Sequence, residues 1–173
     1  MKIKHCTACG SLTIKQVPED DEIARDICCQ CGVVHYQNPI LIVGCVPELD
    51  GQILLCKRNI EPRKGLWTLP AGYLENGETV EQGAARETLE ESQAKVEIIK
   101  PYRMYNIVYV NQIYLIFRAN MKSNAYGPTA ESMDVRLFGK KDIPWNKIAF
   151  PVIKETLEDF YIDRDKNTFS FKI

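Results

Sequence analysis

Three glutamates recur at helical spacing in the middle of the chain, at Glu87, Glu90 and Glu91. At about 100° per residue they share one helix face with Gly83, which would leave room above the carboxylates for a bulky ligand. Like charges at this spacing repel by about 0.2–0.5 kcal/mol a pair, so the strip is unfavourable by itself. Divalent cations such as Mg²⁺ or Mn²⁺ prefer oxygen ligands, so the strip is a candidate metal site. The spacing alone leaves a solvated acidic face as the alternative.

Two pairs of cysteines near the N-terminus have the spacing of a four-cysteine zinc ribbon. Each pair is followed by a glycine, Gly10 or Gly32, which lets the chain turn so that backbone amides can approach the thiolates. Four thiolates complete a tetrahedral shell and leave no position for water, so the predicted zinc is structural. The predicted ligands are Cys6, Cys9, Cys28 and Cys31.

The other cysteines and the histidines are weaker candidates. Cys29 is an alternative ligand, but its spacing to Cys31 is too short for a knuckle. Cys45 and Cys56 fall in apolar strand patterns, where a buried and inert thiol is expected. For the two histidines, His5 and His35, a surface or supporting role is favoured over zinc binding.

A helix must position the three glutamates, and the sequence predicts it from Thr79 to Ser92. Thr79 with Gln82 forms a capping box, which satisfies backbone amides at the helix start. The opposite face is made of small side chains and is expected to lie close to a sheet. Its members are Ala84, Ala85, Thr88, Leu89 and Ser92.

Strands are expected on both sides of this helix. Ile40 to Val46 is an apolar run suited to a buried strand, and Gln52 to Arg58 returns after an Asp50-Gly51 hairpin turn. Trp67, in the stretch that leads into the helix, is expected in the core. Later elements are a short strand at 95–100, a hairpin of 102–110 and 112–121, a strand at 135–138, a helix at 151–161 and a peripheral tail from Asp163.

Cations and aromatic residues suggest substrate contacts. Arg58, Arg63 and Lys64 are candidate partners for an anionic group such as a phosphate, because arginine and lysine bind such groups; a solvated loop is the alternative. Alternating tyrosines could provide a stacking surface for a base, with Tyr105 as the candidate, although such tyrosines are usually core or cross-strand residues. The tyrosines are Tyr102, Tyr105, Tyr109 and Tyr114.

Composition limits the function classes. The length of 173 residues suits one ordinary domain with a small appendage. The net charge of −1 gives no sign of a nucleic-acid or membrane partner, and no long apolar run is present. Without a signal-peptide core, the expected location is cytoplasmic.

The segment from Gly72 to Ala94 resembles the Nudix box of the Nudix hydrolases. The match consists of Gly72, five residues, Glu78, seven residues, and then Arg-Glu-Thr-Leu-Glu-Glu-Ser-Gln-Ala from Arg86. Gln93 departs from the pattern, because the family usually has glycine there, just past the helix end. The resemblance implies an α/β fold, a Nudix α/β/α sandwich with a mixed sheet. The expected domains are a zinc ribbon at 1–36, a Nudix domain at 37–163 and a tail at 164–173.

The family cleaves nucleoside diphosphates linked to another moiety. The ribbon, together with the segment from Ile60 to Gly72, resembles a subgroup associated with ADP-ribose and FAD pyrophosphatase activity, in which AMP is released. NADH pyrophosphatases also carry a ribbon, but the Ser-Gln-Pro-Trp-Pro-Phe-Pro-x-Ser stretch that follows their box is missing here. They are therefore the second hypothesis. A catalytically silent nucleotide sensor, with the ribbon as its partner-binding module, is the third.

The resemblance also assigns roles. Glu87, Glu90 and Glu91, with the backbone carbonyl of Ala71 or Gly72, would bind Mg²⁺ or Mn²⁺. Arg86 would pair with Glu78 or a neighbouring glutamate and hold the acidic cage in shape. Either Glu131, in a loop beyond the box, or a box glutamate would take the proton of the attacking water. The partners implied are a small nucleotide and a second copy of the chain, since ADP-ribose-type members are often dimers.

Overall fold

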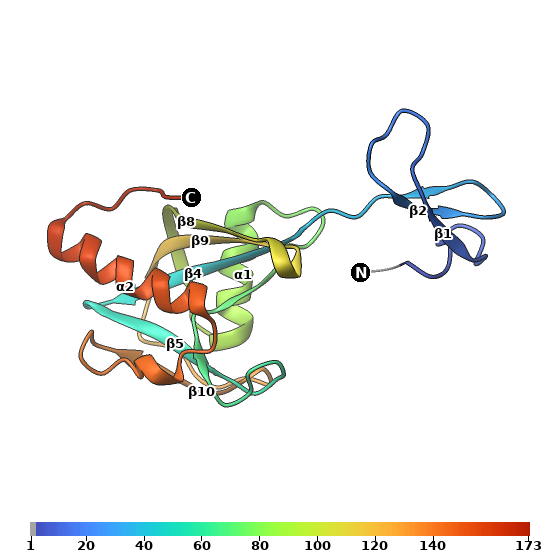
Figure 1. Cartoon of the computed structure of the whole chain (residues 1–173). Coiled ribbons are helices and arrows are strands. Elements are labelled where there is room, and N and C mark those ends of the chain that lie inside the picture. Colours follow the sequence, from blue (N-terminus) through green and yellow to red (C-terminus); the bar gives the residue numbers. More distant parts are fainter. Residues whose placement is uncertain (1–2) are drawn as a thin grey trace. The chain divides into compact units, whose positions relative to one another are not determined.

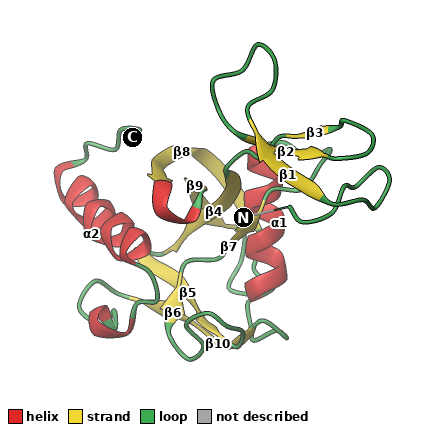
Figure 2. Cartoon of the chain, turned by 45° about the vertical axis from the view of Figure 1, so that its right-hand side comes forward, coloured by secondary structure: helices red, strands yellow, loops and turns green. Residues whose placement is uncertain are grey.

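The computed structural model describes residues 3–173, which form two compact units that divide between Pro39 and Ile40. The N-terminal unit contains a three-stranded antiparallel sheet in the order β1-β2-β3 (Figure 2). Its strands are β1 (Thr13–Gln16), β2 (Arg25–Cys28) and β3 (Val34–His35). The polar segment between β1 and β2 forms an exposed loop, as its composition suggests.

The second unit is built on a mixed sheet with the order β10-β5-β4-β9-β8 (Figure 1). β4 and β9 are parallel, and the other neighbours are antiparallel. Two short strands extend the sheet, since β6 pairs with β5 and β7 pairs with β4. The strands are β4 (Ile40–Leu49), β5 (Gln52–Arg58), β6 (Trp67–Thr68), β7 (Ala71–Tyr73), β8 (Val96–Ile107), β9 (Gln112–Met121) and β10 (Ser132–Phe138).

Two helices cover opposite faces of this sheet, α1 (Val80–Ser92) and α2 (Pro151–Lys166) (Figure 2). The alternation of side chains along β4 separates two apolar clusters. Val43 and Cys45 lie in the cluster with Ala84 of α1, whereas Val46 lies in the cluster with Leu157 of α2. The α/β/α sandwich with a mixed sheet is therefore confirmed. Among residues 3–173, neither helix has the length and apolar character needed to span a bilayer.

Several expected elements have the right type but different limits. β5 has the predicted bounds, and the turn at Asp50 and Gly51 has positive φ at both residues. The expected strand at 95–100 is not separate, because it continues across Pro101 into β8 through two irregularities in register with β9. Residues 108–110, expected to be strand, form a short 3-10 helix that ends at Asn111.

The expectation of a peripheral tail from Asp163 is wrong. α2 continues to Lys166, and the Asp163 side chain is buried, where it accepts hydrogen bonds from the Tyr102 hydroxyl at 2.9 Å and from Arg103 Nη2 at 2.8 Å. Beyond the helix, the Phe169 ring contacts the Tyr102 ring edge to face, and Lys172 forms an isolated bridge with Arg103. The end of the chain thus closes the core over β8.

Candidate active site

Helix α1 positions the acidic residues and starts as the sequence predicts. Thr79 Oγ1 accepts a hydrogen bond from the Gln82 amide at 3.2 Å, and Gln82 Oε1 accepts one from the Thr79 amide at 2.8 Å. This capping box fixes the first turn. Glu87 is therefore carried on a helix whose start is anchored independently of any ligand.

The face of α1 that packs on the sheet differs only in part from the prediction, since Ala84, Thr88 and Ser92 are buried as expected. Leu89 is exposed at 42%, whereas Glu91 is buried at 6%. Gly83 does not open space for a ligand, because a Cβ atom there would lie 2.9 Å from Val43 and 2.8 Å from Leu74. Gly83 instead permits close contact between α1 and the sheet, and this contact rotates Glu91 inward. Both expectations, for Gly83 and for Leu89, are corrected.

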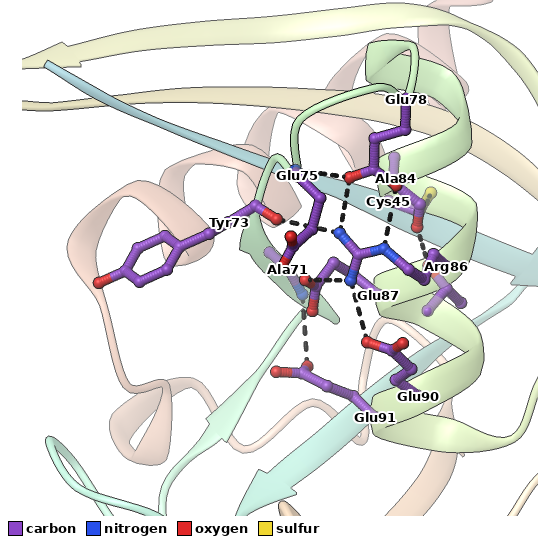
Figure 3. Close-up of polar contacts among 11 residues, drawn as sticks. Cys45, Ala71, Tyr73, Glu75, Glu78, Ala84, Arg86, Glu87, Glu90 and Glu91 are labelled. Carbon is purple, nitrogen blue, oxygen red and sulfur yellow. Dashed lines mark hydrogen bonds and ion pairs between the residues drawn. The ribbon is translucent and has the colours of Figure 1, made fainter. Parts of the chain in front are cut away.

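Arg86 is the centre of the polar network (Figure 3). Its guanidinium donates to both carboxylate oxygens of Glu78, at 3.0 and 2.7 Å. It also donates to Glu87 Oε1 at 2.7 Å and to Glu90 Oε2 at 2.9 Å. A fifth hydrogen bond reaches the carbonyl oxygen of Tyr73 at 3.0 Å. Arg86 therefore orients two of the three strip glutamates and ties them to the loop before the helix.

Strand β7 brings a glycine directly opposite Glu87. A Cβ atom at Gly72 would overlap the Glu87 carboxylate, so only glycine leaves this space between strand and helix. The neighbouring amide of Ala71 donates to Glu91 Oε2 at 3.3 Å (Figure 3). The backbone of β7 and the acidic face of α1 thus form the two walls of a narrow cradle.

Burial changes the protonation of the acidic residues. Desolvation raises the pKa of Glu91 to about 8, although the hydrogen bond from the Ala71 amide opposes the shift. Desolvation also raises the pKa of Glu87, against the effect of Arg86. Glu78 is different, because its hydrogen bonds with Arg86 lower its pKa to about 2. Two carboxyl groups are thus held where a nearby cation would favour their ionised forms.

This donor set fits a hard divalent cation. Glu87, Glu90 and Glu91 line one cavity, and the Glu87 carboxylate lies directly over Gly72, where a Cβ atom would overlap it. The desolvated carboxyl of Glu91 gives the same indication, since a bound cation would stabilise its charged form. In the part of the chain that the structure describes, however, these oxygens do not meet within 4.8 Å of one another, because Arg86 lies between Glu87 and Glu90.

A cavity of about 470 Å³ opens from this cradle. Arg58 lies in it, with its guanidinium 5.2 Å from the centre of the Phe150 ring and its Nε donating to the Pro62 carbonyl at 2.9 Å. The residues that line the cavity are Ile42, Arg58, Ile60, Glu61, Pro62, Thr68, Ala71, Gly72, Tyr73, Glu75, Arg86, Glu87, Glu90, Glu91, Gln112, Tyr114, Glu131 and Phe150. The cavity therefore joins a carboxylate-rich end, which includes Arg86, to aromatic residues and Arg58.

Some candidate substrate contacts lie elsewhere. Arg63 and Lys64 are exposed in the loop after β5 and do not line the cavity. Tyr105 packs on the α2 side of the core, where its hydroxyl accepts a hydrogen bond from Thr156 Oγ1 at 3.1 Å. Of the four tyrosines considered, Tyr114 lines the cavity, together with Tyr73 and Phe150. No local signal identifies Phe150, because it reaches the cavity only through the fold, from the segment before α2.

Gln93 occupies the position where glycine was expected. Its φ of 60° is left-handed, and its amide donates to the Leu89 carbonyl at 2.8 Å. The helix therefore ends with the backbone geometry that glycine favours, although a side chain is present. The glycine-to-Gln93 departure is therefore accommodated by a left-handed residue and not by a different helix end.

The four predicted cysteines meet in the N-terminal unit. Their sulfur atoms all lie within 4.8 Å of one another, with separations of 3.6 Å for Cys6 and Cys31 and 3.5 Å for Cys9 and Cys28. Thiolates at about 2.3 Å from a tetrahedral zinc would be about 3.8 Å apart, so the set fits zinc. Amides of Gln30 and Cys31 donate to Cys28 Sγ, both at 3.4 Å.

The other thiols are separate from this cluster. Cys29 is exposed, while Cys45 and Cys56 are fully buried in the second unit. Burial raises the pKa of Cys45 to about 12 and that of Cys56 still further. These two thiols are therefore protonated and unreactive, as predicted.

Family models match both units. One described as the NUDIX domain matches residues 39–160, and one described as Nudix N-terminal matches residues 4–37. The chain belongs to the Nudix family. This Nudix protein is 48% identical to a NUDIX hydrolase from Nitrosomonas europaea whose crystal structure is known. The two structures match with a TM-score of 0.95, over 98% of this chain and 97% of the other.

Curated relatives are named as hydrolases of two kinds. The Nudix protein is 30% identical over 168 residues to the NAD-capped RNA hydrolase NudC of Vibrio parahaemolyticus, covering 93% of this chain and 62% of the relative. It is 46% identical over 57 residues to an ADP-ribose pyrophosphatase of Methanocaldococcus jannaschii, covering 33% and 34% of the two chains. The chain spans about three fifths of the length of the NudC relatives it matches.

Proposed function

We propose that this Nudix hydrolase cleaves the diphosphate bond of a nucleoside diphosphate linked to another moiety, with ADP-ribose and FAD as first candidates and AMP as a product. The observation that supports the proposal is the set of residues that line one cavity. It joins the carboxylates of Glu87, Glu90 and Glu91 to Arg58 and the Phe150 ring. A diphosphate needs cations, and a base needs a flat apolar surface.

Mg²⁺, or Mn²⁺, is the proposed cofactor of the acidic end. Glu87, Glu90 and Glu91 would hold it, together with backbone oxygen from β7 near Gly72. When bound, such an ion neutralises charge on phosphate oxygens and lowers the pKa of water, which makes water a nucleophile at neutral pH. In the N-terminal unit, the four cysteines would hold a structural Zn²⁺.

The protein groups have separate tasks. Arg86 orients Glu87 and Glu90 through the hydrogen bonds described above. Arg58 is placed to contact a phosphate or to shield its charge from Glu91. The proton of the attacking water would pass to Glu131 or to a box glutamate, since both line the same cavity.

A second candidate is a substrate of the NAD type. The relatives that align with nine tenths of this chain are named NAD-capped RNA hydrolases, so NADH and the NAD-bearing 5′ end of RNA are substrates to test. This hypothesis adds a nucleic acid to the proposed partners, although the net charge of −1 gave no sign of one. The Ser-Gln-Pro-Trp-Pro-Phe-Pro-x-Ser stretch of NADH pyrophosphatases is missing after the Nudix box. ADP-ribose and FAD therefore remain the first candidate substrates.

A product assay tests the proposal. The full chain with Mg²⁺ or Mn²⁺ is incubated with ADP-ribose, FAD, NADH and a short NAD-capped RNA, and kcat/KM is compared. Preference for ADP-ribose or FAD with AMP released supports the main proposal, whereas preference for NADH or capped RNA supports the second. Tight nucleotide binding without turnover of any of them would instead support a silent sensor. Sedimentation velocity of the same sample tests the homodimer expectation.

Replacement of one carboxylate tests the metal site. E90Q should lower kcat by about a hundredfold or more, because a ligand oxygen is lost, while the far-UV spectrum stays unchanged. E81Q is the matched control, since Glu81 is exposed in the first turn of the same helix and lies outside the cavity. If E90Q turned over like E81Q, the proposed metal site would be wrong.

A further inference from the structure

The segment that carries Glu131 is bonded to the end of helix α1. We call residues 123–131, which connect β9 to β10, the Glu131 loop. The Gly127 amide donates to the Ser92 carbonyl at 2.9 Å, and Gln93 Nε2 donates to the Pro128 carbonyl at 2.6 Å. The loop is therefore fixed to the turn directly after Glu91.

The other side of the loop is bonded to the end of strand β5. Asn59 donates twice, from its side-chain Nδ2 to the Ala130 carbonyl at 3.0 Å and from its backbone amide to the Glu131 carbonyl at 2.7 Å. Asn59 directly follows Arg58, which lines the cavity. The Glu131 loop is thus held between the helix that carries the acids and the strand that carries the arginine.

Gln93 makes a contact that glycine could not make. Its left-handed backbone is the conformation in which glycine is preferred, so the side chain is retained at a conformational cost. The same side chain is exposed to solvent and its amide group reaches Pro128 in the loop. The departure from the Nudix pattern at this position therefore coincides with a bond to the loop that ends at the cavity.

We propose that Gln93 and Asn59 are positioning residues that clamp the Glu131 loop from two sides and hold Glu131 at the cavity. The inference rests on the proposed function and on Glu131 as the group, of the two candidates named there, that takes the proton of the attacking water. Glu131 itself is exposed. Its carbonyl accepts a hydrogen bond from the Asn59 amide at 2.7 Å, and its amide donates to Thr129 Oγ1 at 3.2 Å. Loosening the clamp would leave the carboxylate present but misplaced.

Two single variants test the clamp in the full chain. Q93G removes the side-chain bond and also relieves the left-handed backbone, and N59A removes the bond to Ala130 but keeps the backbone bond to Glu131. Both should speed amide hydrogen exchange in the peptide covering residues 123–132 and lower kcat by about tenfold, with KM unchanged, because a misplaced group loses rate. The melting temperature of Q93G should not fall, because glycine relieves the left-handed backbone. A fall in kcat at an unchanged melting temperature would not result from a loss of stability.

N167G is the matched control. Asn167 is also a left-handed residue at a helix C-cap, but it ends α2 and lies outside the cavity. N167G should leave amide hydrogen exchange in residues 123–132 and kcat unchanged. An effect seen in Q93G but not in N167G is then due to loss of the Gln93 side chain and not to relief of a left-handed backbone.

A double-variant comparison decides whether the clamp acts through Glu131. E131Q should lower kcat, and adding Q93G to E131Q should have no further effect. The inference would be overturned by unchanged amide hydrogen exchange of residues 123–132 in Q93G and N59A. It would also be overturned if Q93G lowered kcat equally in the wild-type and E131Q backgrounds. E131Q with wild-type kcat would overturn it as well. If the wild-type chain turned over none of the substrates, the proposed function would be wrong, while the exchange data would still support or overturn the clamp itself.

Discussion

Arg86 and Glu78 form a forked ion pair across the start of helix α1, with Nε to Oε2 at 3.0 Å and Nη2 to Oε1 at 2.7 Å. Glu78 lies in the loop before α1, whereas Arg86 lies in the middle of the helix. The pair therefore fixes this loop against the side of α1. The remaining donors of the same guanidinium reach Glu87 and Glu90. The loop and the acidic strip are therefore oriented by one side chain.

R86K should lower kcat/KM by about tenfold to a hundredfold, because lysine keeps the charge but cannot donate in a fork to Glu78 while reaching Glu87. Thermal stability should change little, since the Arg86 side chain is partly exposed and bridges at such sites contribute little. R136K is the control, because Arg136 pairs with Asp134 on the surface of β10. Wild-type kcat/KM in R86K would contradict an orienting role.

G72A should lower both turnover and Mn²⁺ affinity by about a hundredfold, because the added methyl group overlaps the Glu87 carboxylate and displaces it. Mn²⁺ binding is followed by electron paramagnetic resonance and turnover by AMP release. G139A is the control, since its methyl group would meet only Asp142 Oδ2, at 3.2 Å. Equal Mn²⁺ affinity in G72A and G139A would show that the cradle at Gly72 is not the metal site.

C28S should lose the bound zinc and unfold the N-terminal unit, because a unit this small depends on the metal for much of its folding energy. C29S should keep the zinc, since Cys29 is exposed and lies outside the cluster of four sulfur atoms. Elemental analysis of the two purified variants gives the zinc content per chain. Zinc retained in C28S and lost in C29S would reverse the assignment of ligands.

D163N should reduce the free energy of unfolding of the second unit at neutral pH by about 3 kcal/mol, because it leaves the buried Arg103 without one of its two carboxylates. Burial acts to raise the pKa of Asp163, but hydrogen bonds from Arg103 and Tyr102 outweigh it and hold the pKa below its ordinary value. A lowered pKa means that the contribution is complete above the ordinary value of about 3.9 and is lost as the pH falls through the folded value.

The difference between wild type and D163N should therefore be constant above about pH 5 and shrink below about pH 4. Urea unfolding followed by tryptophan fluorescence measures it, since Trp67 and Trp145 both lie in the second unit. D165N is the control, because Asp165 pairs with Lys140 at an exposed position of the same helix. A difference that grew as the pH fell would contradict the sign of the shift.

Local chemistry explains what could be predicted. The capping box at Thr79 starts α1 where expected, and the turn at Asp50 returns the chain into β5, because both depend on neighbouring residues alone. The cysteine cluster was predicted in the same way, because two cysteine pairs at zinc-ribbon spacing indicate that their four sulfur atoms bind one zinc ion. The pattern of glutamates, glycine and arginine was sufficient to indicate the Nudix family, which the family models then confirmed.

Helical periodicity correctly predicted the burial of Ala84, Thr88 and Ser92 in α1, but it was wrong for Leu89 and Glu91. Leu89 points to solvent and Glu91 to the sheet, because Gly83 lets the helix approach Val43 closely and this contact sets the rotation of the helix. The tail from Asp163 was expected to be peripheral. In the fold, Asp163 is buried because Arg103, sixty residues earlier, neutralises it.

The sequence by itself determined the two units, the helix start, the thiol cluster and the acidic strip, since each depends on residues close together along the chain. Only the tertiary structure decided what shares the cavity with that strip. Phe150 and Arg58 meet there across ninety residues, whereas Tyr105 turns to Thr156 instead. Contacts over such distances are set by the register of strands and by the docking of helices, and neither is encoded in the spacing of single residues.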